Sequence, residues 1–588
     1  MLKKEGSRDR NLKTHQRQTM TFVFVMVLVF SFVLCGRLSY LMIAMAPHYG
    51  VMAKELHERE RKIKAKRGNL FDRNGNVIAG NVSVSTISVI HSQVKDPEKV
   101  ISVLSKELEL DENEVRKRVE KVSLREKVKS NVPKEVSDRI REYNLDGVMV
   151  DEDYKRYYPY GSLASHVIGF TGADNQGIIG LEVTYDEMLS GTDGAILTLT
   201  NASGIEIKNA SEDRIEPISG KSLLLSLDIN IQTYAEQAAA RVMEQKAAKA
   251  VSIIIMNPDN GEIYGMVSLP EFNLNEPFVM SDGQKNTDMN VLNAMWRNPC
   301  ISDTYEPGST FKIITSAAAL NEGVVSLNDS FHCPGYITVE DRRIRCHKVT
   351  GHGSENFVQG VMNSCNPVFI TLGARLGTDN FYKYLDKFMV LEKTGVDLPG
   401  EAKAVMHNKA NVGAVELATI SFGQSFQITP LRLMASVSSI INGGHSIVPH
   451  FGVAETDEEL NIIRKLEFES KNNIISEDIS NTMCNILESV VSEGTGKKAF
   501  VEGYHVAAKT GTSEKLPRRN NRYIASCIGF APSSDPKVMA LVLVDEPQGI
   551  YYGGTIAAPV IAELFDNILP YMGIEKDKGA DTDEQSKQ

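Results

Sequence analysis

An apolar stretch near the N-terminus constrains this chain more than any other feature. The residues from Thr21 to Ala46 are apolar except for Arg37 and a few small polar side chains. A run of this length can cross the ~30 Å hydrocarbon core of a bilayer as one helix. We therefore expect a membrane helix over 21–46, preceded by a short basic tail over 1–20.

The charges before the apolar stretch predict its orientation. Basic residues outnumber acidic ones there: Lys3, Lys4, Arg8, Arg10, Lys13 and Arg17 stand against Glu5 and Asp9. The positive-inside rule then places the N-terminus in the cytoplasm and the chain after Ala46 outside the cell membrane. A cleavable signal peptide is the alternative, because Ala44-Met45-Ala46 resembles a cleavage site. We favour an uncleaved anchor, since the apolar run exceeds the usual signal-peptide core and Pro47 would follow the cut directly.

Length and charge exclude some classes of protein. The 588 residues suffice for several domains and at least one large core. The formal net charge of −11 gives no reason to expect a nucleic-acid partner. Seven cysteines in a chain of this size do not make a disulfide scaffold.

The chain divides into two regions of different pattern after the apolar stretch. Residues 47–219 are rich in strand-like runs, with a hairpin signal at Asn74-Gly75 and a charged helical interval over 96–141. From residue 220 a buried strand, a long amphipathic helix (IQTYAEQAAARVMEQKAAK) and a hairpin around Asp259-Asn260-Gly261 follow in turn. This order predicts a mixed sheet packed with helices, an α+β domain over 220–572. The polar residues 573–588 are expected to be disordered.

A serine and a lysine three residues apart occur at three places in the chain. Ser92/Lys95 falls at a strand-to-helix junction without any supporting motif. Ser534/Lys537 lies in PSSDPK, which is typical of a solvated turn between two strands. Neither pair indicates chemistry.

The third pair, in EPGSTFK, has a different context. The run that follows Pro307-Gly308 has the apolar spacing of a helix ending near Gly323, so Ser309 lies at a helix N-terminus. Lys312 is one turn further on the same face, where its amine can reach the Ser309 hydroxyl. The alternative is that Ser309 merely caps the helix and Lys312 is solvated. The heptapeptide alone favours that alternative.

Two further motifs reverse this judgement. Ser364-Cys365-Asn366 interrupts the apolar stretch GVMNSCNPVFI. Lys509-Thr510-Gly511-Thr512 has the pattern of a strand edge, where glycine lets a ligand backbone approach and the lysine and threonines can bind a carboxylate. Each motif is weak alone, but the ordered set indicates a serine nucleophile with a lysine base.

The chain resembles the class B penicillin-binding proteins, which are membrane-anchored D,D-transpeptidases of peptidoglycan. The resemblance runs from about Arg67 to Pro570 and includes the stretches RGNLFDRNG, YYPYGSLASHVIGF, GIIGLE, YEPGSTFK, SCN, TGVDLPGE, ITPLRL, KTGT and YYGGTIAAP. Two residues depart from the pattern: Ser425 stands where the family usually has glycine, and Arg432 where it often has glutamine. The implied fold is α+β: a membrane helix, an elongated β-rich pedestal of the dimerisation type over 47–219, and a transpeptidase domain over 220–572 whose antiparallel sheet lies between helices.

The resemblance implies roles for the motif residues. Ser309 would attack the penultimate D-Ala carbonyl of a stem peptide and form an acyl-enzyme, with Lys312 as the general base. Ser364 would relay a proton toward the leaving amine. Asn366 would hold Lys312 and the substrate amide. Penicillin would acylate the same serine as a substrate mimic.

The remaining implied roles concern substrate binding. Lys509, Thr510 and Thr512 would bind the terminal carboxylate, and Gly511 would allow the close approach of the substrate. The backbone N–H groups of Ser309 and Thr512 would form an oxyanion hole. No cofactor and no metal are implied.

The same resemblance suggests partners. It points to the septal branch, which acts in division or sporulation, and so to stem peptides, β-lactams, the membrane, divisome proteins and a separate SEDS-type glycosyltransferase as partners. No glycosyltransferase domain is expected in the chain itself. Three other functions stay open: a serine β-lactamase, a β-lactam sensor, and a scaffold of the division machinery that does not need its catalytic serine.

The cysteines at 333 and 346 form the one notable pair. They bracket a hairpin-like stretch, FHCPGYITVEDRRIRCHK, and are flanked by His332 and His347. A disulfide is favoured here because the pair lies on the oxidising side of the membrane; free thiols come next. Zinc held by these two Cys and two His is the least favoured, because neighbours on a strand point to opposite faces. Cys365 is expected to be a small core residue.

Some further residues could line a binding groove. Trp296, Tyr551 and Tyr552 are candidates, although packing explains them equally well. The basic loop 515–522 could contact phosphates, but a charge run is more often simply hydrated.

Overall fold

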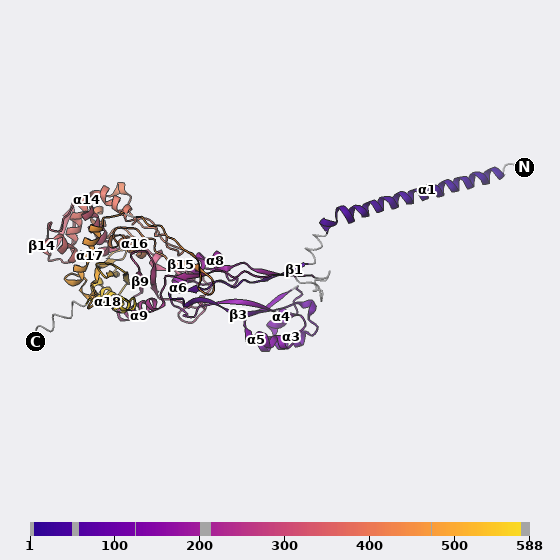
Figure 1. Ribbon diagram of the computed structural model, residues 1–588, viewed down its shortest axis with the longest axis horizontal. Coiled ribbons are helices and arrows are strands. Elements are labelled where there is room, and N and C mark those ends of the chain that lie inside the picture. The colour runs from indigo at the N-terminus through magenta and orange to yellow at the C-terminus, as the bar shows by residue number, and fades with distance from the viewer. Residues whose placement is uncertain (1–4, 50–57, 124, 200–212, 472, 578–588) are drawn as a thin grey trace. The chain divides into compact units, whose positions relative to one another are not determined.

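The computed structural model describes residues 5–49, 58–123, 125–199, 213–471 and 473–577. They form a mixed α+β protein, as the sequence predicts, with the elements labelled in Figure 1. The chain folds as two compact units. The first comprises residues 1–64, 83–153 and 193–218, and the second comprises 65–82, 154–192 and 219–588. Because both units are discontinuous, the predicted boundary at 219/220 stays a prediction.

The N-terminal helix has the length and composition of a membrane span. Helix α1 (Glu5–Ser39) continues into a π-helical turn, Tyr40–Ala44. The most apolar part of His15–Ala44 has a mean hydropathy of 2.4, and none of it is buried by protein. The helical stretch therefore covers residues 21–44 of the predicted segment 21–46 and begins earlier, within the basic tail.

The first unit contains a small three-stranded sheet. Strand β1 (Glu58–Ile63) pairs antiparallel with β6 (Gly194–Leu199), which pairs with β7 (Asp213–Ile215). The density of Lys, Arg, Glu and His over 51–67 predicts a solvated stalk, and the part at β1 is instead a strand. The stretch GIEIKNA (204–210), which the sequence predicts to be strand-like, lies outside the described residues.

The rest of the first unit contains the charged interval 96–141. Its helices are α3 (Pro97–Leu108), α4 (Glu112–Val119) and α5 (Lys134–Glu142). The sequence predicts Pro97 and Pro133 in the first turns of helices. Pro97 does begin α3, but Pro133 ends a strand, β4 (Glu126–Pro133), that the sequence did not predict. That strand pairs with the second half of β3 (Val77–Val89) and buries only Val128 and Val132, so its sequence lacks a clear alternation.

The second unit begins with a hairpin at the predicted turn. Strand β2 (Leu70–Phe71) pairs with the start of β3 across Asn74-Gly75, and β8 (Ser222–Leu225) runs parallel to β2. Strands β15 (Gly452–Thr456) and β16 (Ile462–Lys465) extend this sheet beyond β8. Two further elements lie wholly or mostly in the first unit: η2 (His91–Gln93) and β5 (Val148–Tyr157). Three short helices of the second unit follow: α6 (Ser165–Ile168), α7 (Gly180–Thr184) and α8 (Asp186–Ser190).

A five-stranded antiparallel sheet forms the centre of the second unit. Its strand order is β10-β9-β19-β18-β17, which leaves β17 at an edge. The strands are β9 (Ala250–Met256), β10 (Ile263–Leu269), β17 (Ala507–Glu514), β18 (Tyr523–Ala531) and β19 (Val538–Asp545). Their apolar runs are nearly continuous because both faces of the sheet are covered.

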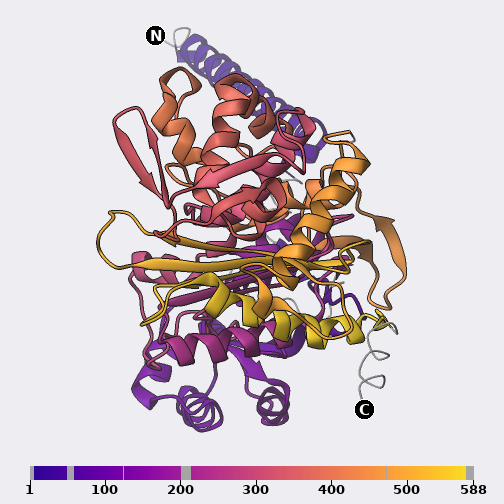
Figure 2. The same ribbon diagram turned by 90° about the vertical axis from the view of Figure 1, so that its left-hand side faces the viewer.

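Helices cover both faces of this sheet. On one face, α9 (Ile229–Lys246) and α18 (Gly553–Tyr571) pack on residues such as Ile253 and Val542. On the other, α12 (Lys312–Asn321), α16 (Pro430–Ile441) and α17 (Glu477–Ser492) share a core with Ile254 and Leu541. Figure 2 shows this arrangement with the sheet seen edge-on. The predicted sheet between helices is therefore confirmed.

The remaining elements of the second unit lie between β10 and β18. They are α10 (Met289–Trp296), α11 (Pro299–Ser302), η3 (Gly308–Phe311), β11 (Ser330–Cys333), β12 (Tyr336–Val339), β13 (Arg342–Arg345), β14 (Gly353–Asn356), α13 (Phe357–Met362), α14 (Asn366–Lys387), η4 (Lys409–Asn411), α15 (Ala414–Ile420) and η5 (Lys497–Ala499).

Candidate active site

Ser309 lies on a single 3-10 turn, η3, that leads into α12. The preceding Gly308 has a φ of +57°, a conformation that favours glycine, and its N–H donates to the Gly423 carbonyl at 2.8 Å. A Cβ on Gly423 would lie 2.0 Å from the Gly308 carbonyl oxygen. Two glycines in close contact thus fix the backbone that presents Ser309.

Lys312 begins α12 and is completely buried. Its Nζ donates to the Ser364 carbonyl at 2.8 Å, to the Ser364 Oγ at 3.2 Å and to the Asn366 Oδ1 at 2.7 Å. All three acceptors are neutral. Burial lowers the pKa of Lys312 to about 8, so roughly a tenth of the amine is unprotonated at pH 7 and about half at pH 8.

Ser364 occupies a strained turn between α13 and α14. Its φ of 54° is left-handed, which is uncommon for a residue with a side chain and is found mostly where function requires it. Asn366 follows as the first residue of α14, and its Nδ2 donates to the Arg345 carbonyl at 3.1 Å. The Asn366 amide is therefore held at both ends, by Arg345 and by Lys312.

Lys509 lies on β17, and the predicted position of this motif at a strand edge is confirmed. The side chain is completely buried, and its Nζ donates to the Thr510 carbonyl at 3.3 Å. Burial first, and then the nearby charge of Lys312, hold the pKa of Lys509 well below its usual value. The charge of Lys312 thus weakens the protonation of Lys509.

The residues that follow Lys509 on β17 contact neighbouring elements. The Thr510 hydroxyl lies 3.4 Å from the Thr495 hydroxyl, and the Thr512 Oγ1 accepts from the Gly553 N–H at 3.1 Å, at the start of α18. A Cβ on Gly511 would lie 2.6 Å from the Ser526 Oγ, so this position has no room for a side chain.

A cleft of about 800 Å³ joins these three motifs. Its lining includes Ser309, Ser364, Asn366, Thr510, Gly511 and Thr512. Lys312 and Lys509 do not line it, because both are buried beneath its surface. The structure thus places the three motifs in or directly beneath one cleft, in an arrangement that can support acyl transfer to a serine. The hydrogen bonds of the Lys312 amine in the described residues go to Ser364 and Asn366, and none joins it to the Ser309 hydroxyl.

The other two Ser-x-x-Lys pairs lie where the sequence predicts. Lys95 is exposed and pairs with Asp146 between β3 and α3. Lys537 is exposed in the turn between β18 and β19 and pairs with Asp535 at 2.7 Å. Neither pair has an equivalent of Ser364 or Asn366 bound to its lysine among the hydrogen bonds of the described residues.

The weaker candidates separate into two groups. Trp296 is a packing residue: it is buried against Phe170, and its Nε1 donates to the Pro277 carbonyl. Tyr552 lines the cleft, and Tyr551 stacks on Tyr523 beside it with ring centroids 3.9 Å apart.

The basic loop 515–522 is not simply hydrated. Lys515 pairs with Asp545, and Arg518 contacts both oxygens of Glu306 at 2.9 and 2.8 Å. Glu306 also accepts from the Ser425 N–H at 2.8 Å. This ion pair ties the loop to the segment that precedes Ser309. Such long-range pairing cannot be read from local sequence.

The cysteine pair is not bonded in this structure. Cys333 and Cys346 are buried free thiols on either side of the predicted hairpin, β12–β13. His352 and Cys365 lie beside them, and His332 is exposed. The disulfide stays a prediction. His352 is five residues beyond His347, and only the fold shows that it is the histidine of this cluster.

Two family models match the chain. The model for the penicillin binding protein transpeptidase domain matches residues 251–566, and the model for the penicillin-binding protein dimerisation domain matches residues 62–225. The structure is also similar to that of penicillin-binding protein 2X from Streptococcus thermophilus, with a TM-score of 0.73, 23% identity, and coverage of 88% of this chain and 81% of that one. At this identity the likeness shows the fold.

Relatives of higher identity extend along most of the chain. Stage V sporulation protein D of Bacillus subtilis is 39% identical over 551 residues, which cover 92% of this chain and 84% of the relative. The peptidoglycan D,D-transpeptidase FtsI of Escherichia coli is 28% identical and is covered to 90%. The chain therefore belongs to the class B penicillin-binding proteins, with a dimerisation domain followed by a transpeptidase domain.

Proposed function

We propose that this protein is a membrane-anchored peptidoglycan D,D-transpeptidase that cross-links stem peptides in septal wall synthesis, during division or sporulation. The observation that carries this proposal is the buried Lys312 amine bound only to neutral acceptors, on Ser364 and Asn366, one turn from Ser309. The relatives named above, a sporulation protein and a D,D-transpeptidase, support the same activity.

The proposed reaction begins with proton transfer. The neutral Lys312 amine accepts the proton of the Ser309 hydroxyl as the oxygen attacks the penultimate D-Ala carbonyl. The Ser309 and Thr512 backbone N–H groups stabilise the tetrahedral oxyanion, at about 3 kcal/mol for each donor. The peptide bond then breaks, and the terminal D-Ala leaves as its amine takes a proton through Ser364.

A second stem peptide completes the cross-link. Its side-chain amine attacks the acyl-enzyme carbonyl, loses a proton to Lys312, and releases the Ser309 hydroxyl. The free edge of β17 supports binding of the donor peptide as an added strand, with Lys509, Thr510 and Thr512 at its terminal carboxylate.

The charge of the cleft supports an anionic substrate. Among the described residues that line it there is no Asp or Glu, although the whole chain has a net charge of −11. Its cationic lining residues are Arg345, Lys348, Lys497 and Lys498. Such a concentration of positive charge attracts peptides that carry carboxylates beyond the terminal one.

The anchor and partners complete the proposal. The basic residues before the apolar stretch 21–46 favour a cytoplasmic N-terminus, with the catalytic domain outside the membrane. The proposed partners are a SEDS-type glycosyltransferase, which would polymerise the glycan strands, and divisome proteins.

Cross-linking by the full-length protein tests the function. The protein is incubated in lipid vesicles with a lipid-linked peptidoglycan precursor and a polymerising glycosyltransferase, and the products are digested and separated. We expect cross-linked peptide dimers and free D-Ala from the wild type and from Ser534→Ala, which changes an unrelated Ser-x-x-Lys serine. Ser309→Ala should yield uncross-linked strands only. Dimers from Ser309→Ala would refute the proposed nucleophile.

One experiment in cells and one with the purified protein test two of the alternatives. Septal wall assembly that is unaffected by Ser309→Ala would support a scaffold. Rapid catalytic hydrolysis of penicillin by the purified protein would support a β-lactamase.

A further inference from the structure

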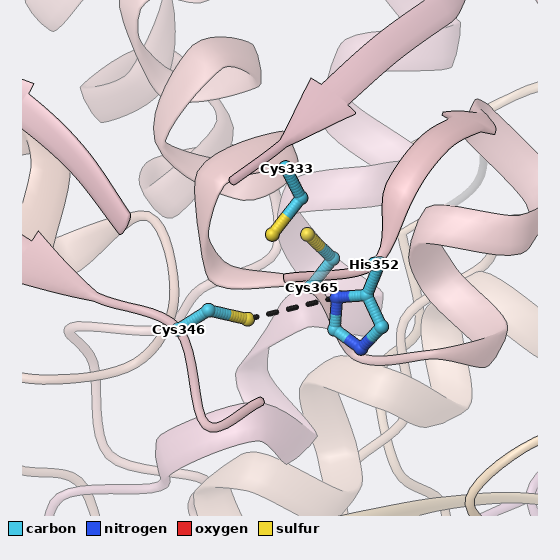
Figure 3. A group of neighbouring side chains, drawn as sticks. All are labelled: Cys333, Cys346, His352 and Cys365. Carbon is cyan, nitrogen blue, oxygen red and sulfur yellow. Dashed lines mark hydrogen bonds between the residues drawn. The ribbon is translucent and has the colours of Figure 1, made fainter. Parts of the chain in front are cut away.

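Three sulfur atoms and an imidazole meet beside the candidate active site. Cys333 ends β11, Cys346 follows β13, His352 precedes β14, and Cys365 precedes α14. One ligand atom from each of these four residues lies within 4.8 Å of the other three. Figure 3 shows the three sulfur atoms and the ring nitrogen directed toward a common centre. Four segments that are separate in the sequence thus converge on one point.

The spacing suits a tetrahedral metal site. Zinc bonds of about 2.3 Å to sulfur and about 2.0 Å to nitrogen place a thiolate and an imidazole nitrogen roughly 3.6 Å apart. The Cys346 Sγ and the His352 Nδ1 are 3.7 Å apart. The four ligand atoms all lie within 4.8 Å of one another. This limit is about 1 Å more than the ~3.8 Å between two sulfurs bound to one zinc ion, and side-chain rotation can close the difference.

The ligands are buried, as they are in structural metal sites. The three cysteines are at most 2% exposed and the His352 side chain is 6% exposed. Thiolate sulfur selects zinc and other soft cations over magnesium and calcium, which prefer oxygen. Three cysteines and one histidine are a complete ligand set that leaves no position open for substrate.

A buried carboxylate lies next to the cluster. The Glu355 Oε2 accepts from the Asn363 amide at 3.0 Å, but the Oε1 is buried and accepts no hydrogen bond from any described residue. This oxygen lies 3.9 Å from the His352 Nδ1, on the side of the cluster. Three thiolates already outweigh the two positive charges of a zinc ion, so Glu355 lies outside the ligand set.

We propose that Cys333, Cys346, His352 and Cys365 bind one zinc ion. The three thiols each lose a proton to solvent on binding, and the imidazole binds as the neutral ring through its Nδ1. No electron transfer is involved. The ligand set differs from the one considered in the sequence: His332 is exposed, and the fold supplies His352 and Cys365 instead.

The zinc ion would hold two walls of the active site together. Cys365 lies between Ser364 and Asn366, whose side chains bind Lys312. Cys346 follows Arg345, whose carbonyl accepts from the Asn366 amide. One ion bound to both cysteines therefore fixes the turn that positions the proposed base. Cys346 and Cys365 are in this sense positioning residues that act through their neighbours.

The metal content of the full-length protein tests the site. The protein is purified in detergent without added metal, and its zinc is measured by elemental mass spectrometry. We expect about one zinc per chain, as in structural zinc sites of this composition. His352→Ala and Cys333→Ser should lose the zinc. Their matched controls, His332→Ala at an exposed histidine and Cys484→Ser at a buried cysteine outside the cluster, should retain it.

Measurements on the wild type alone also decide the matter if a variant fails to fold. Cobalt exchanged into the site should give the intense absorption of tetrahedral cobalt bound to thiolates, and a mercurial reagent should release zinc as it titrates the thiols. Wild-type protein without zinc would overturn the proposal. A gain of two daltons on reduction would show a disulfide in place of the metal. Thiols that react freely before any chelator is added would show free cysteines, and either outcome would overturn the proposal.

A second readout tests the coupling to catalysis, which rests on the proposed function. Removal of zinc should slow acylation by a fluorescent penicillin by roughly 10- to 100-fold, because small displacements of catalytic groups have effects of that size. His332→Ala should acylate at the wild-type rate. Stoichiometric zinc with unchanged acylation after its removal would overturn the coupling. A failure of Ser309 to acylate in zinc-loaded protein would instead count against the proposed function.

Discussion

Two groups of buried cations lie in the same compact unit and differ in what surrounds them. Arg67 and Arg156 contact the two oxygens of Glu182 at 2.7 and 2.6 Å, and all three side chains are buried. Lys312 and Lys509 are equally buried, but the hydrogen-bond acceptors of their amines are neutral. The first group joins β5 and the segment that precedes β2 to α7, and the second lies under the cleft.

The pairing decides whether a buried cation keeps its proton. Burial disfavours the charged form of Arg67, but the charges of Glu182 and Asp186 outweigh it, so the pKa of Arg67 is raised overall. Burial without a carboxylate partner lowers the pKa of Lys312 to about 8 and holds that of Lys509 well below its usual value. Paired buried cations thus keep their protons, and unpaired ones are available for proton transfer.

Removal of the proposed base should have the largest effect. Lys312→Gln retains a polar side chain but cannot accept a proton, so acylation by penicillin should fall by roughly 10²- to 10⁴-fold. Stopped-flow fluorescence with a labelled penicillin measures this rate. Lys383→Gln on α14, a half-exposed lysine paired with Glu322, is the control and should acylate normally. Normal acylation by Lys312→Gln would show that the buried amine is not the base.

Loss of the paired carboxylate should affect stability instead of chemistry. Glu182→Gln removes the charge partner of Arg156 and leaves Arg67 with Asp186 alone, and the free energy of unfolding should fall by about 3–5 kcal/mol. Thermal unfolding of the full-length protein measures the loss. The exposed pair Lys66–Glu458 offers a control, Glu458→Gln, which should cost less than about 1 kcal/mol.

The fraction of Glu182→Gln that stays folded should acylate at the wild-type rate. A slower rate in that folded fraction would mean that the two groups of cations are not separable into structure and catalysis.

The pH dependence of acylation should report the unpaired lysines. As pH rises through about 8, Lys312 loses its proton, so the rate should increase about tenfold per pH unit below that value and then level off. The same shift affects stability: the folded pKa lies below the unfolded one, so the unfolded chain binds more protons between them and the free energy of unfolding rises with pH in this window. A rate that is flat or falls between about pH 6 and 8 would contradict a neutral Lys312 as base.

The cationic rim should have the smallest effect. Lys497→Gln together with Lys498→Gln removes two exposed charges from the cleft lining, so KM for an anionic stem peptide should rise roughly two- to fivefold while kcat stays unchanged. Steady-state D-Ala release at low and high salt measures the change, which should shrink as salt rises. An equal rise in KM for a peptide whose side-chain carboxylates are amidated would argue against charge recognition.

Much of the fold could be predicted from local pattern. The membrane helix, α9, the β9–β10 hairpin and the edge position of β17 all follow from periodicity and turn residues. Strand β4 and the discontinuous units do not, because both depend on which distant segment covers an apolar face. Burial on one side of a short strand leaves little signal in its own sequence.

The candidate site likewise has residues that could be predicted from the sequence and features that could not. Ser309, Ser364 and Lys509 were identifiable because each lies in a motif with a recognisable context. The left-handed backbone of Ser364 and the meeting of His352 with Cys365 were not, because tertiary contacts impose both. The favoured pairing of Cys333 with Cys346 reflected sequence proximity, and the structure adds two more ligand atoms to the same place.

The site of penicillin attachment tests the central claim most directly. Full-length protein is treated with a labelled penicillin, digested, and mapped by mass spectrometry. We expect one adduct per chain, on the peptide that contains Ser309, and none in Ser309→Ala. An adduct on Ser364 or Ser534, or a label that persists in Ser309→Ala, would contradict the account.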